Sequence, residues 1–189
     1  MLPSTDDLLA TARHYWPASM ADALEEANPE FQRRTQRWNE ALRQVEQWDG
    51  FRQHLKAVLP GCSMGDGTTT SQASFRCIVY PAKGSPKPPI PWAVVGCMSI
   101  LAPVFTVYGI TFEYEGRKRR AAKLHLTPLP GPMEETARIV ARELELRFHV
   151  TELPREVAAP PVPVVVEWTE PPKTTLFDAL FDSEPTIVP

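Results

Sequence analysis

No charged residue interrupts the stretch Pro88-Pro-Ile-Pro-Trp-Ala-Val-Val-Gly-Cys-Met-Ser-Ile-Leu-Ala-Pro-Val-Phe-Thr-Val-Tyr-Gly-Ile-Thr-Phe112, which is 25 residues long. An apolar run of about 20 residues is long enough to cross a bilayer as a helix. The same run is also typical of neighbouring strands buried at the centre of a sheet. The choice between these two structures decides the fold of the whole chain.

The composition of this stretch favours the sheet. Val, Ile, Thr and Phe are frequent in strands, and Pro103 in the middle of the run counts against a continuous helix. Gly96 and Gly109 also lie inside it. We therefore predict two strands, at about 92–100 and 104–115, which are joined near Ala102-Pro103.

The alternation of side chains continues beyond the apolar part. Ile110, Phe112 and Tyr114 would face one side of the second strand. Glu115-Gly116 is then a plausible two-residue turn into a strand of matching period, through residues 122–126. A membrane helix does not continue as a hairpin of matched period, so we predict a soluble sheet and no membrane span.

Further strand and helix signals surround this hairpin. Ser74–Tyr80 alternates and is predicted to be a strand, whereas residues 61–73 are rich in Gly, Ser and Thr and are predicted to be a loop. Asn28-Pro29-Glu30 is typical of a helix start, and it predicts a long helix over residues 29–58 with a bend at Gly50. The apolar stripe of this helix contains Phe31, Trp38, Leu42, Val45, Trp48, Phe51, Leu55 and Val58. A later amphipathic helix starts at Gly131 and carries Met133, Ala137, Val140, Ala141, Leu144 and Phe148.

Together these elements predict an α+β fold, in which an antiparallel β-meander of four to five strands is flanked by the long N-terminal helix and the later amphipathic helix. The chain has 189 residues, which suits one domain. We expect this domain to cover residues 1–153. Residues 154–189 are rich in proline and are predicted to form a tail that packs on the domain. The tail is expected to contain a strand at Pro163–Trp168 and a short terminal helix at Thr175–Asp182, capped by Thr175.

Charge and cysteine content limit the classes of function. The formal net charge of −3 gives no general attraction for nucleic acid or for anionic lipid. The three cysteines, Cys62, Cys77 and Cys97, are an odd and sparse set that fits a reducing compartment. The N-terminus has no basic segment followed by an apolar one, so no signal peptide is expected. We therefore predict a cytoplasmic protein that binds neither nucleic acid nor membranes.

No catalytic or metal-binding pattern stands out in the sequence. Zinc sites usually contain close pairs of ligands, whereas these three cysteines are far apart. We therefore expect no metal, no cofactor, no catalytic residue and no enzymatic activity. An alternative is a small enzyme with an unrecognised Cys/His site, for which Cys62 is the candidate nucleophile, although no Lys, Arg or His lies next to it to lower its pKa.

Two segments are candidates for contact with a partner. Arg117, Lys118, Arg119 and Arg120 form the tip of the predicted hairpin, and alternation would send Arg117 and Arg119 to one side and the other two side chains to the opposite side. Such a tip can bind phosphate, as a β-ribbon that reads nucleic acid does, it can bind an acidic protein surface, or it can simply keep the hairpin soluble. In the terminal helix, Phe177 and Phe181 belong to an apolar surface that either folds back onto the domain or docks on a partner or on a second copy of the chain.

The end of the chain, Glu170-Pro-Pro-Lys-Thr-Thr-Leu-Phe-Asp-Ala-Leu-Phe-Asp-Ser-Glu-Pro-Thr-Ile-Val-Pro189, resembles the tails of small immunity proteins that are encoded beside bacterial polymorphic toxins. The layout of a helical N-terminal part, an antiparallel meander, a helix and a Pro-rich tail is also similar. The resemblance implies a cytoplasmic, non-enzymatic bacterial protein that binds and neutralises one cognate toxin. A structural or adaptor subunit of a larger bacterial assembly, docked through the terminal helix, is the alternative, and the sequence leaves a homo-oligomer open.

Overall fold

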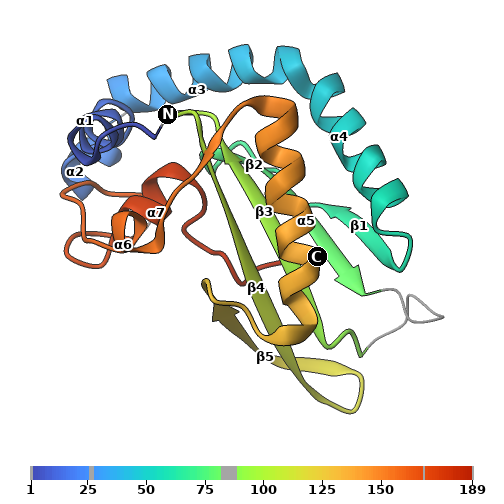
Figure 1. The fold of residues 1–189 in the computed structure, drawn as a ribbon. Helices are drawn as coiled ribbons and strands as arrows, with labels where there is room; N and C mark the ends of the chain where they lie inside the picture. Colours follow the sequence, from blue (N-terminus) through green and yellow to red (C-terminus); the bar gives the residue numbers. More distant parts are fainter. Residues whose placement is uncertain (1, 26–27, 82–88, 168, 189) are drawn as a thin grey trace.

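The computed structural model describes residues 2–25, 28–81, 89–167 and 169–188. Within them, the chain forms an antiparallel sheet that has helices on one face and the end of the chain on the other (Figure 1). This confirms the predicted α+β class and the antiparallel meander. No helix in these ranges has the length and apolar character needed to cross a bilayer.

Five antiparallel strands lie side by side in the order in which they occur in the chain. They are β1 (Cys62–Asp66), β2 (Ser74–Pro81), β3 (Trp92–Ser99), β4 (Val104–Glu115) and β5 (Lys118–His125). The uncharged stretch forms β3 and β4, as predicted, and β5 completes the predicted hairpin. A two-residue strand, β6 (Thr151–Glu152), runs parallel to the first residues of β4.

Strand β1 shows that the prediction of a loop over residues 61–73 was wrong in part. Its five residues pair with β2 along their whole length, at one edge of the sheet. The strand is short and largely without β-branched residues, so its sequence lacks the usual signals. At Gly65 the backbone passes close to the ring of Tyr80, and an added Cβ would lie 3.3 Å from the Cε2 atom of that ring.

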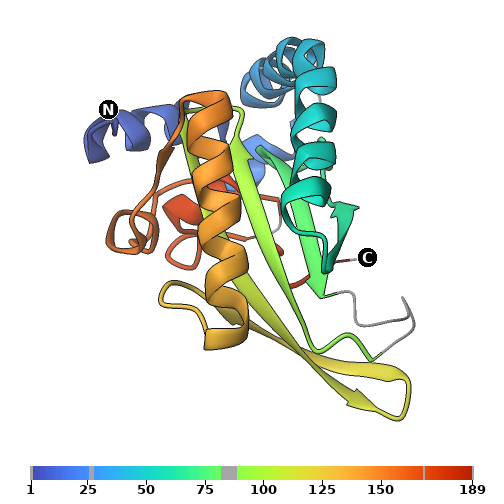
Figure 2. The same ribbon diagram turned by 45° about the vertical axis from the view of Figure 1, so that its right-hand side comes forward.

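Helices α4 (Val45–Val58) and α5 (Gly131–Phe148) cover one face of the sheet, which we call the helix face, and α3 (Pro29–Ala41) lies across the end of the sheet where β2 begins (Figure 2). Phe75 on β2 points to this face, and its ring centroid lies 5.3 Å from that of Trp48 on α4. Helix α5 lies very close to β3, because a Cβ added to Gly96 would be 2.7 Å from Cγ1 of Val140. The buried centre of the molecule is therefore the uncharged hairpin together with these helices.

The long helix predicted over residues 29–58 is divided by a 3₁₀ turn, η1 (Leu42–Gln44), and not at Gly50. Trp38 and Trp48 both contact Phe75, with ring centroids 5.3 Å away in each case. In a continuous α-helix, ten residues turn by about 1000°, which would leave these two side chains about 80° apart. A 3₁₀ turn rotates the chain by about 120° per residue and so brings them closer to one face. Leu42, at the joint, is consequently 38% exposed, although the sequence pattern predicted it to be buried.

The N-terminal helices are α1 (Thr5–Tyr15) and α2 (Met20–Ala23). Ser4 and Asp7 form a capping box at the start of α1. Asn28 caps α3 in the predicted way, because the amide of Phe31 donates to its side-chain oxygen at 2.6 Å.

The tail, residues 154–189, covers the opposite face of the sheet, which we call the tail face. It contains α6 (Arg155–Ala158) and α7 (Leu176–Leu180), and Thr175 forms a capping box with Asp178, so the terminal helix begins where the sequence predicted. Buried tail residues such as Leu180 belong to the same apolar cluster as the residues of the predicted domain at 1–153.

The predicted strand at Pro163–Trp168 does not form in the residues that are described there. Val166 makes only an isolated bridge with Thr169, and Glu167 has a positive φ of 52° that turns the chain back. The amide of Val165 donates instead to the carbonyl oxygen of Pro17, at 2.8 Å. The valines are buried, but they pack against the region after α1 and do not extend a sheet, and a run of valines does not distinguish these two arrangements.

Candidate binding sites

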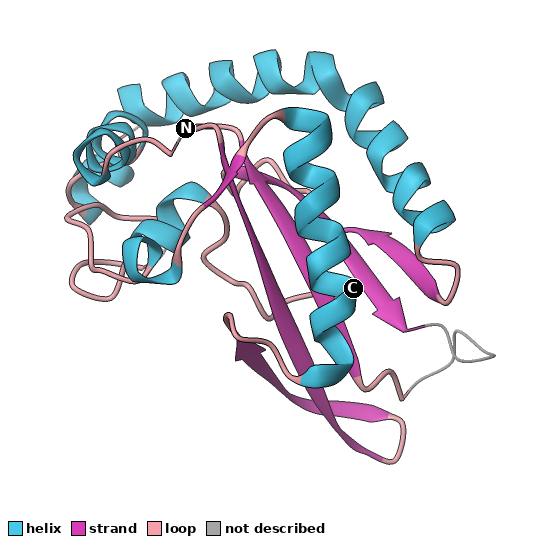
Figure 3. Cartoon of the chain, viewed as in Figure 1, coloured by secondary structure: helices cyan, strands magenta, loops and turns pink. Residues whose placement is uncertain are grey.

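The β4–β5 hairpin extends beyond the other strands and carries the basic residues at its end (Figure 3). We call Arg117, Lys118, Arg119 and Arg120 the basic tip. The two turn residues are Gly116 and Arg117, one position later than predicted. Gly116 has a φ of 61°, a left-handed conformation that glycine adopts without steric strain.

A β-bulge corrects the predicted alternation within the basic tip. Tyr114 pairs with Arg119 and Glu113 pairs with Ala121, so Arg120 is an additional residue. The bulge turns the Arg119 side chain onto the tail face, where its guanidinium lies 4.1 Å from the centroid of the Phe112 ring. Arg119 also donates to the carbonyl oxygen of Val188 at 3.0 Å, and thereby connects the hairpin to the tail.

The four basic residues therefore differ in their availability to a partner. Arg119 is held by the tail, and Arg120 forms an ion pair with Glu115. Arg117 and Lys118 are exposed, and across residues 2–25, 28–81, 89–167 and 169–188 no side chain forms an ion pair with either of them. The tip thus presents two solvated cations next to Arg119, which connects the hairpin to the tail.

The other candidate partner residues lie in the interior. Phe177 is 8% exposed and Phe181 is fully buried, and the Phe177 ring centroid lies 5.7 Å from that of Tyr108 on β4. The terminal helix is thus folded back on the domain, the first of the two arrangements that the sequence left open. Phe181 cannot contact a partner while the tail is packed in this way, whereas a small part of Phe177 remains exposed at a groove beside β4.

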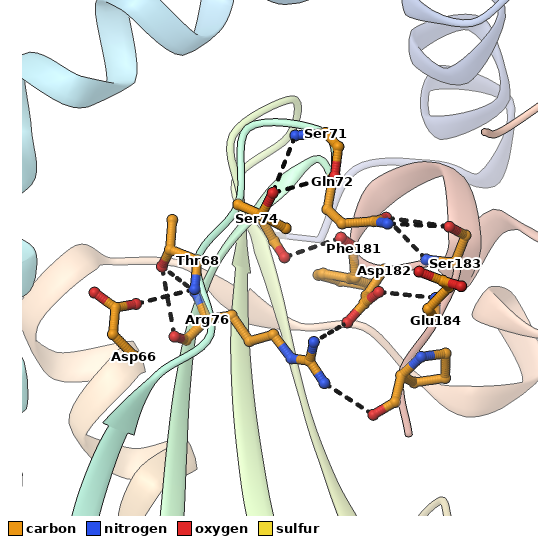
Figure 4. Close-up of polar contacts among 12 residues, drawn as sticks. Asp66, Thr68, Ser71, Gln72, Ser74, Arg76, Phe181, Asp182, Ser183 and Glu184 are labelled. Carbon is orange, nitrogen blue, oxygen red and sulfur yellow. Dashed lines mark hydrogen bonds and ion pairs between the residues drawn. The ribbon is translucent and has the colours of Figure 1, made fainter. Parts of the chain in front are cut away.

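A group of buried polar contacts holds the tail on the sheet (Figure 4). The Nη1 atom of Arg76, on β2, lies 2.7 Å from a carboxylate oxygen of Asp182, and both side chains are almost completely buried. The Nη2 atom of Arg76 donates to the carbonyl oxygen of Pro185 at 2.9 Å. Nearby, the hydroxyl of Ser74 donates to the carbonyl oxygen of Phe181, and the amide of Ser183 donates to the side-chain oxygen of Gln72.

The electrostatic surroundings keep Arg76 charged. Burial lowers the pKa of its guanidinium, but Tyr108, Cys97 and Asp182 have a larger combined effect in the opposite direction, so that the pKa is raised overall. A buried ion pair of this kind is costly to break, because the remaining partner would be a buried and unpaired charge. We infer that this network holds the tail on the sheet.

The cysteines lie in surroundings that disfavour the reactive thiolate. Burial raises the pKa of Cys77 and of Cys97 to about 12. Partial burial also raises the pKa of Cys62, although a hydrogen bond with Thr136 opposes the shift. Nothing in these positions activates a nucleophile, which depends on a lowered thiol pKa. In the part of the chain that the structure describes, no three His, Cys, Asp or Glu side chains are placed to hold a metal ion.

A groove of about 690 Å³ lies between the tail and the outer edge of β4. We call it the tail-side groove. Its apolar wall contains Leu124, Leu126, Leu153 and Phe177, and its polar wall contains Thr106, Glu152, Arg155, Lys173 and Asp178. Burial raises the pKa of Asp178, while hydrogen bonds from Thr175 oppose the shift. The volume lies in the range that is typical of ligand sites.

A second hollow, of about 510 Å³, lies on the other side of the same sheet edge. We call it the helix-side hollow, and its lining includes Val107, Glu134, Ala137, Ala141, Glu145 and Glu152. Val107, Thr127 and Glu152 line both cavities. Partial desolvation raises the pKa of Glu152, and the nearby charge of Glu145 adds to the shift.

Sequence reasoning did not identify either cavity. Their walls combine residues from β4, the end of β5, α5, β6 and the tail, which are far apart in the chain. The one local signal was the Pro-rich segment after residue 153, which indicated a change of direction but no site. No protein family matches the chain, and neither a curated protein nor a solved structure shows significant similarity to it.

Proposed function

We propose that this chain is a non-enzymatic, cytoplasmic binding protein that contacts an acidic surface of a partner protein with its basic tip. The observation that supports this proposal is the pair of exposed cations, Arg117 and Lys118. They lie on a projecting hairpin that a hydrogen bond from Arg119 connects to the tail. Unpaired cations on a fixed support accelerate association with an acidic partner and add specificity.

The particular role that we propose is that of an immunity protein that neutralises a cognate bacterial toxin. The support for it is the resemblance of residues 170–189 to the tails of such proteins, together with the overall layout. The burial of Phe181 and of most of Phe177 gives no support to the adaptor alternative, which docks through an exposed terminal helix. The raised pKa of Cys62 likewise gives no support to a thiol enzyme.

Co-expression with the product of a toxin-like gene next to its own gene tests this role. The expected result is relief of toxicity together with a stable complex of the two purified proteins. Toxicity that persists during co-expression, or two proteins that elute separately in size-exclusion chromatography, would contradict the proposal.

A charge-reversal variant tests the surface. Arg117→Glu combined with Lys118→Glu should slow association by about tenfold or more at low salt, and the difference should shrink at high salt because the effect is electrostatic. Lys123→Glu is the matched control, since Lys123 is an exposed cation of the same hairpin that lies away from the turn. Equal association rates for the two variants would show that the partner does not bind the basic tip.

A further inference from the structure

The outer edge of β4 is interrupted between β6 and β5. Pairing with β6 ends at Phe105, whose carbonyl oxygen accepts from the amide of Leu153 at 2.8 Å. Pairing with β5 starts only at Gly109, opposite His125. The interval from Phe105 to Gly109 spans about 13 Å at about 3.3 Å per residue. Figure 1 shows this interval on β4, between the end of β5 and the start of the segment that leads to α6.

Val107 lies in the middle of this break. The amide and carbonyl groups of one strand residue point to the same side, and this side alternates along the strand. Since Phe105 and Gly109 pair towards the outer edge, Val107 must direct its amide and carbonyl there too. No residue of the described ranges pairs with Val107 at this edge, although the residue is only 5% exposed. Native proteins satisfy nearly all buried backbone groups with a partner or with ordered water.

The two cavities meet at this position and make it suitable for a peptide. A bound residue opposite Val107 would exchange hydrogen bonds with both of its backbone groups. Its side chain would lie on the same face as that of Val107, towards the helix-side hollow. The two neighbouring side chains would point to the other face, into the tail-side groove. A compact small molecule would not use a hydrogen-bonding edge and a cavity on each side of it in this alternating way.

The charges around the break indicate which peptide fits. The helix-side hollow contains Glu134, Glu145 and Glu152, while Arg138 forms an ion pair with Glu135. Arg142 is the one remaining cation of the hollow. The repulsion between Glu145 and Glu152 would be relieved by a basic side chain. In the tail-side groove, Leu124, Leu126 and Phe177 offer an apolar wall.

We infer that the break at Val107 binds an extended peptide segment of another protein with the pattern apolar–basic–apolar. The segment adds about three residues to the sheet, its basic side chain faces Glu145 and Glu152, and its apolar side chains enter the tail-side groove. This inference goes beyond the proposed function, because it uses neither the basic tip nor the immunity role.

The peptide acetyl-Leu-Lys-Leu-amide is a suitable probe for the full-length chain labelled with ¹⁵N. The expected result is a saturable shift of the Val107 amide signal. A peptide that is N-methylated at the lysine amide should bind about tenfold more weakly, because it cannot donate to the Val107 carbonyl oxygen. Acetyl-Leu-Glu-Leu-amide should also bind about tenfold more weakly, since it places a third carboxylate beside two others.

Protein variants complete the test. Glu145→Gln combined with Glu152→Gln should remove the preference for lysine over glutamate, whereas Glu46→Gln, an exposed control on α4, should leave it unchanged. The variant with both tip residues reversed should bind the peptide as the unmodified protein does, which separates this inference from the proposed function. An unmoved Val107 signal, or equal binding of the lysine, N-methylated and glutamate peptides to the unmodified protein, would overturn the inference.

Discussion

The buried guanidinium of Arg76 lies on the tail face of β2, where Asp182 and the carbonyl oxygen of Pro185 hold it. The alternation predicted for Ser74–Tyr80 puts the neighbouring residues Phe75 and Arg76 on opposite faces, as the structure has them. The sequence could not show that this face is covered, because the covering residues follow more than one hundred positions later. A charged residue in a strand ordinarily indicates that the position is exposed, whereas here the tail covers Arg76 and buries it.

Asp182→Asn tests how much this residue pair contributes to stability. The substitution removes the negative charge but leaves Arg76 charged and buried, so the free energy of unfolding should fall by about 3–5 kcal/mol. Urea unfolding followed by circular dichroism measures this change. Asp49→Asn is the control, because Asp49 forms an exposed ion pair with Arg52, and its loss should cost about 0–1 kcal/mol. A similar loss of unfolding free energy in both variants would show that the Arg76–Asp182 pair contributes no more to stability than an exposed ion pair does.

At the scale of the elements, the strands and helices with a strong period were predicted well. The hairpin of β3 and β4, and helix α5, follow directly from their patterns of apolar residues. The exceptions have local causes that the spacing of apolar residues does not reveal. The 3₁₀ turn at Leu42–Gln44 adjusts the rotation of α4 relative to α3, and the bulge at Arg120 adds a residue to β5. Strand β1 is short and at an edge, so it carries almost no apolar signal.

The close contact of α5 with the sheet leads to a paired prediction on two glycines. Gly96→Ala would place a Cβ 2.7 Å from Val140 and should lower the free energy of unfolding by about 1–3 kcal/mol through overpacking. Gly50 lies in α4, and no atom is within 4 Å of a Cβ added there. Gly50→Ala should therefore raise the free energy of unfolding by about 0.5–1 kcal/mol. Chemical denaturation of both variants gives the comparison. A neutral Gly96→Ala variant would mean that α5 can move away from the sheet.

At the scale of the whole molecule, the tail completes the core. Leu176, Leu180 and Phe181 are buried between the sheet and the N-terminal helices, and the ring nitrogen of Trp16 donates to the carbonyl oxygen of Ala179 at 2.7 Å. The sequence indicated a packed tail, but it did not show that the tail shares one core with residues 1–153. The two cavities beside β4 depend on the same arrangement, so no local motif could have revealed them.

Removal of residues 170–189 should therefore unfold the protein, whereas a terminal helix that only docked on a partner, as in the adaptor hypothesis, could be removed with the core intact. The deletion exposes the tail face and leaves Arg76 without its carboxylate partner. Thermal unfolding and size-exclusion chromatography of the shortened chain should show no cooperative transition and an aggregated or expanded species. Ile187→Ala is the control, because Ile187 is 61% exposed and its loss should be nearly neutral. A shortened chain that still unfolds cooperatively would contradict this view of the tail.

The β-bulge in the basic tip separates two tasks within four consecutive residues. Arg119 holds the hairpin to the tail, while Arg117 and Lys118 face only solvent. Residues that bind a partner often trade affinity against stability, because one side chain serves both purposes. Here the two exposed positions can accumulate substitutions at little cost to folding. Under the proposed function, natural selection could therefore redirect the tip from one partner to another by changing these two side chains while the scaffold stays the same.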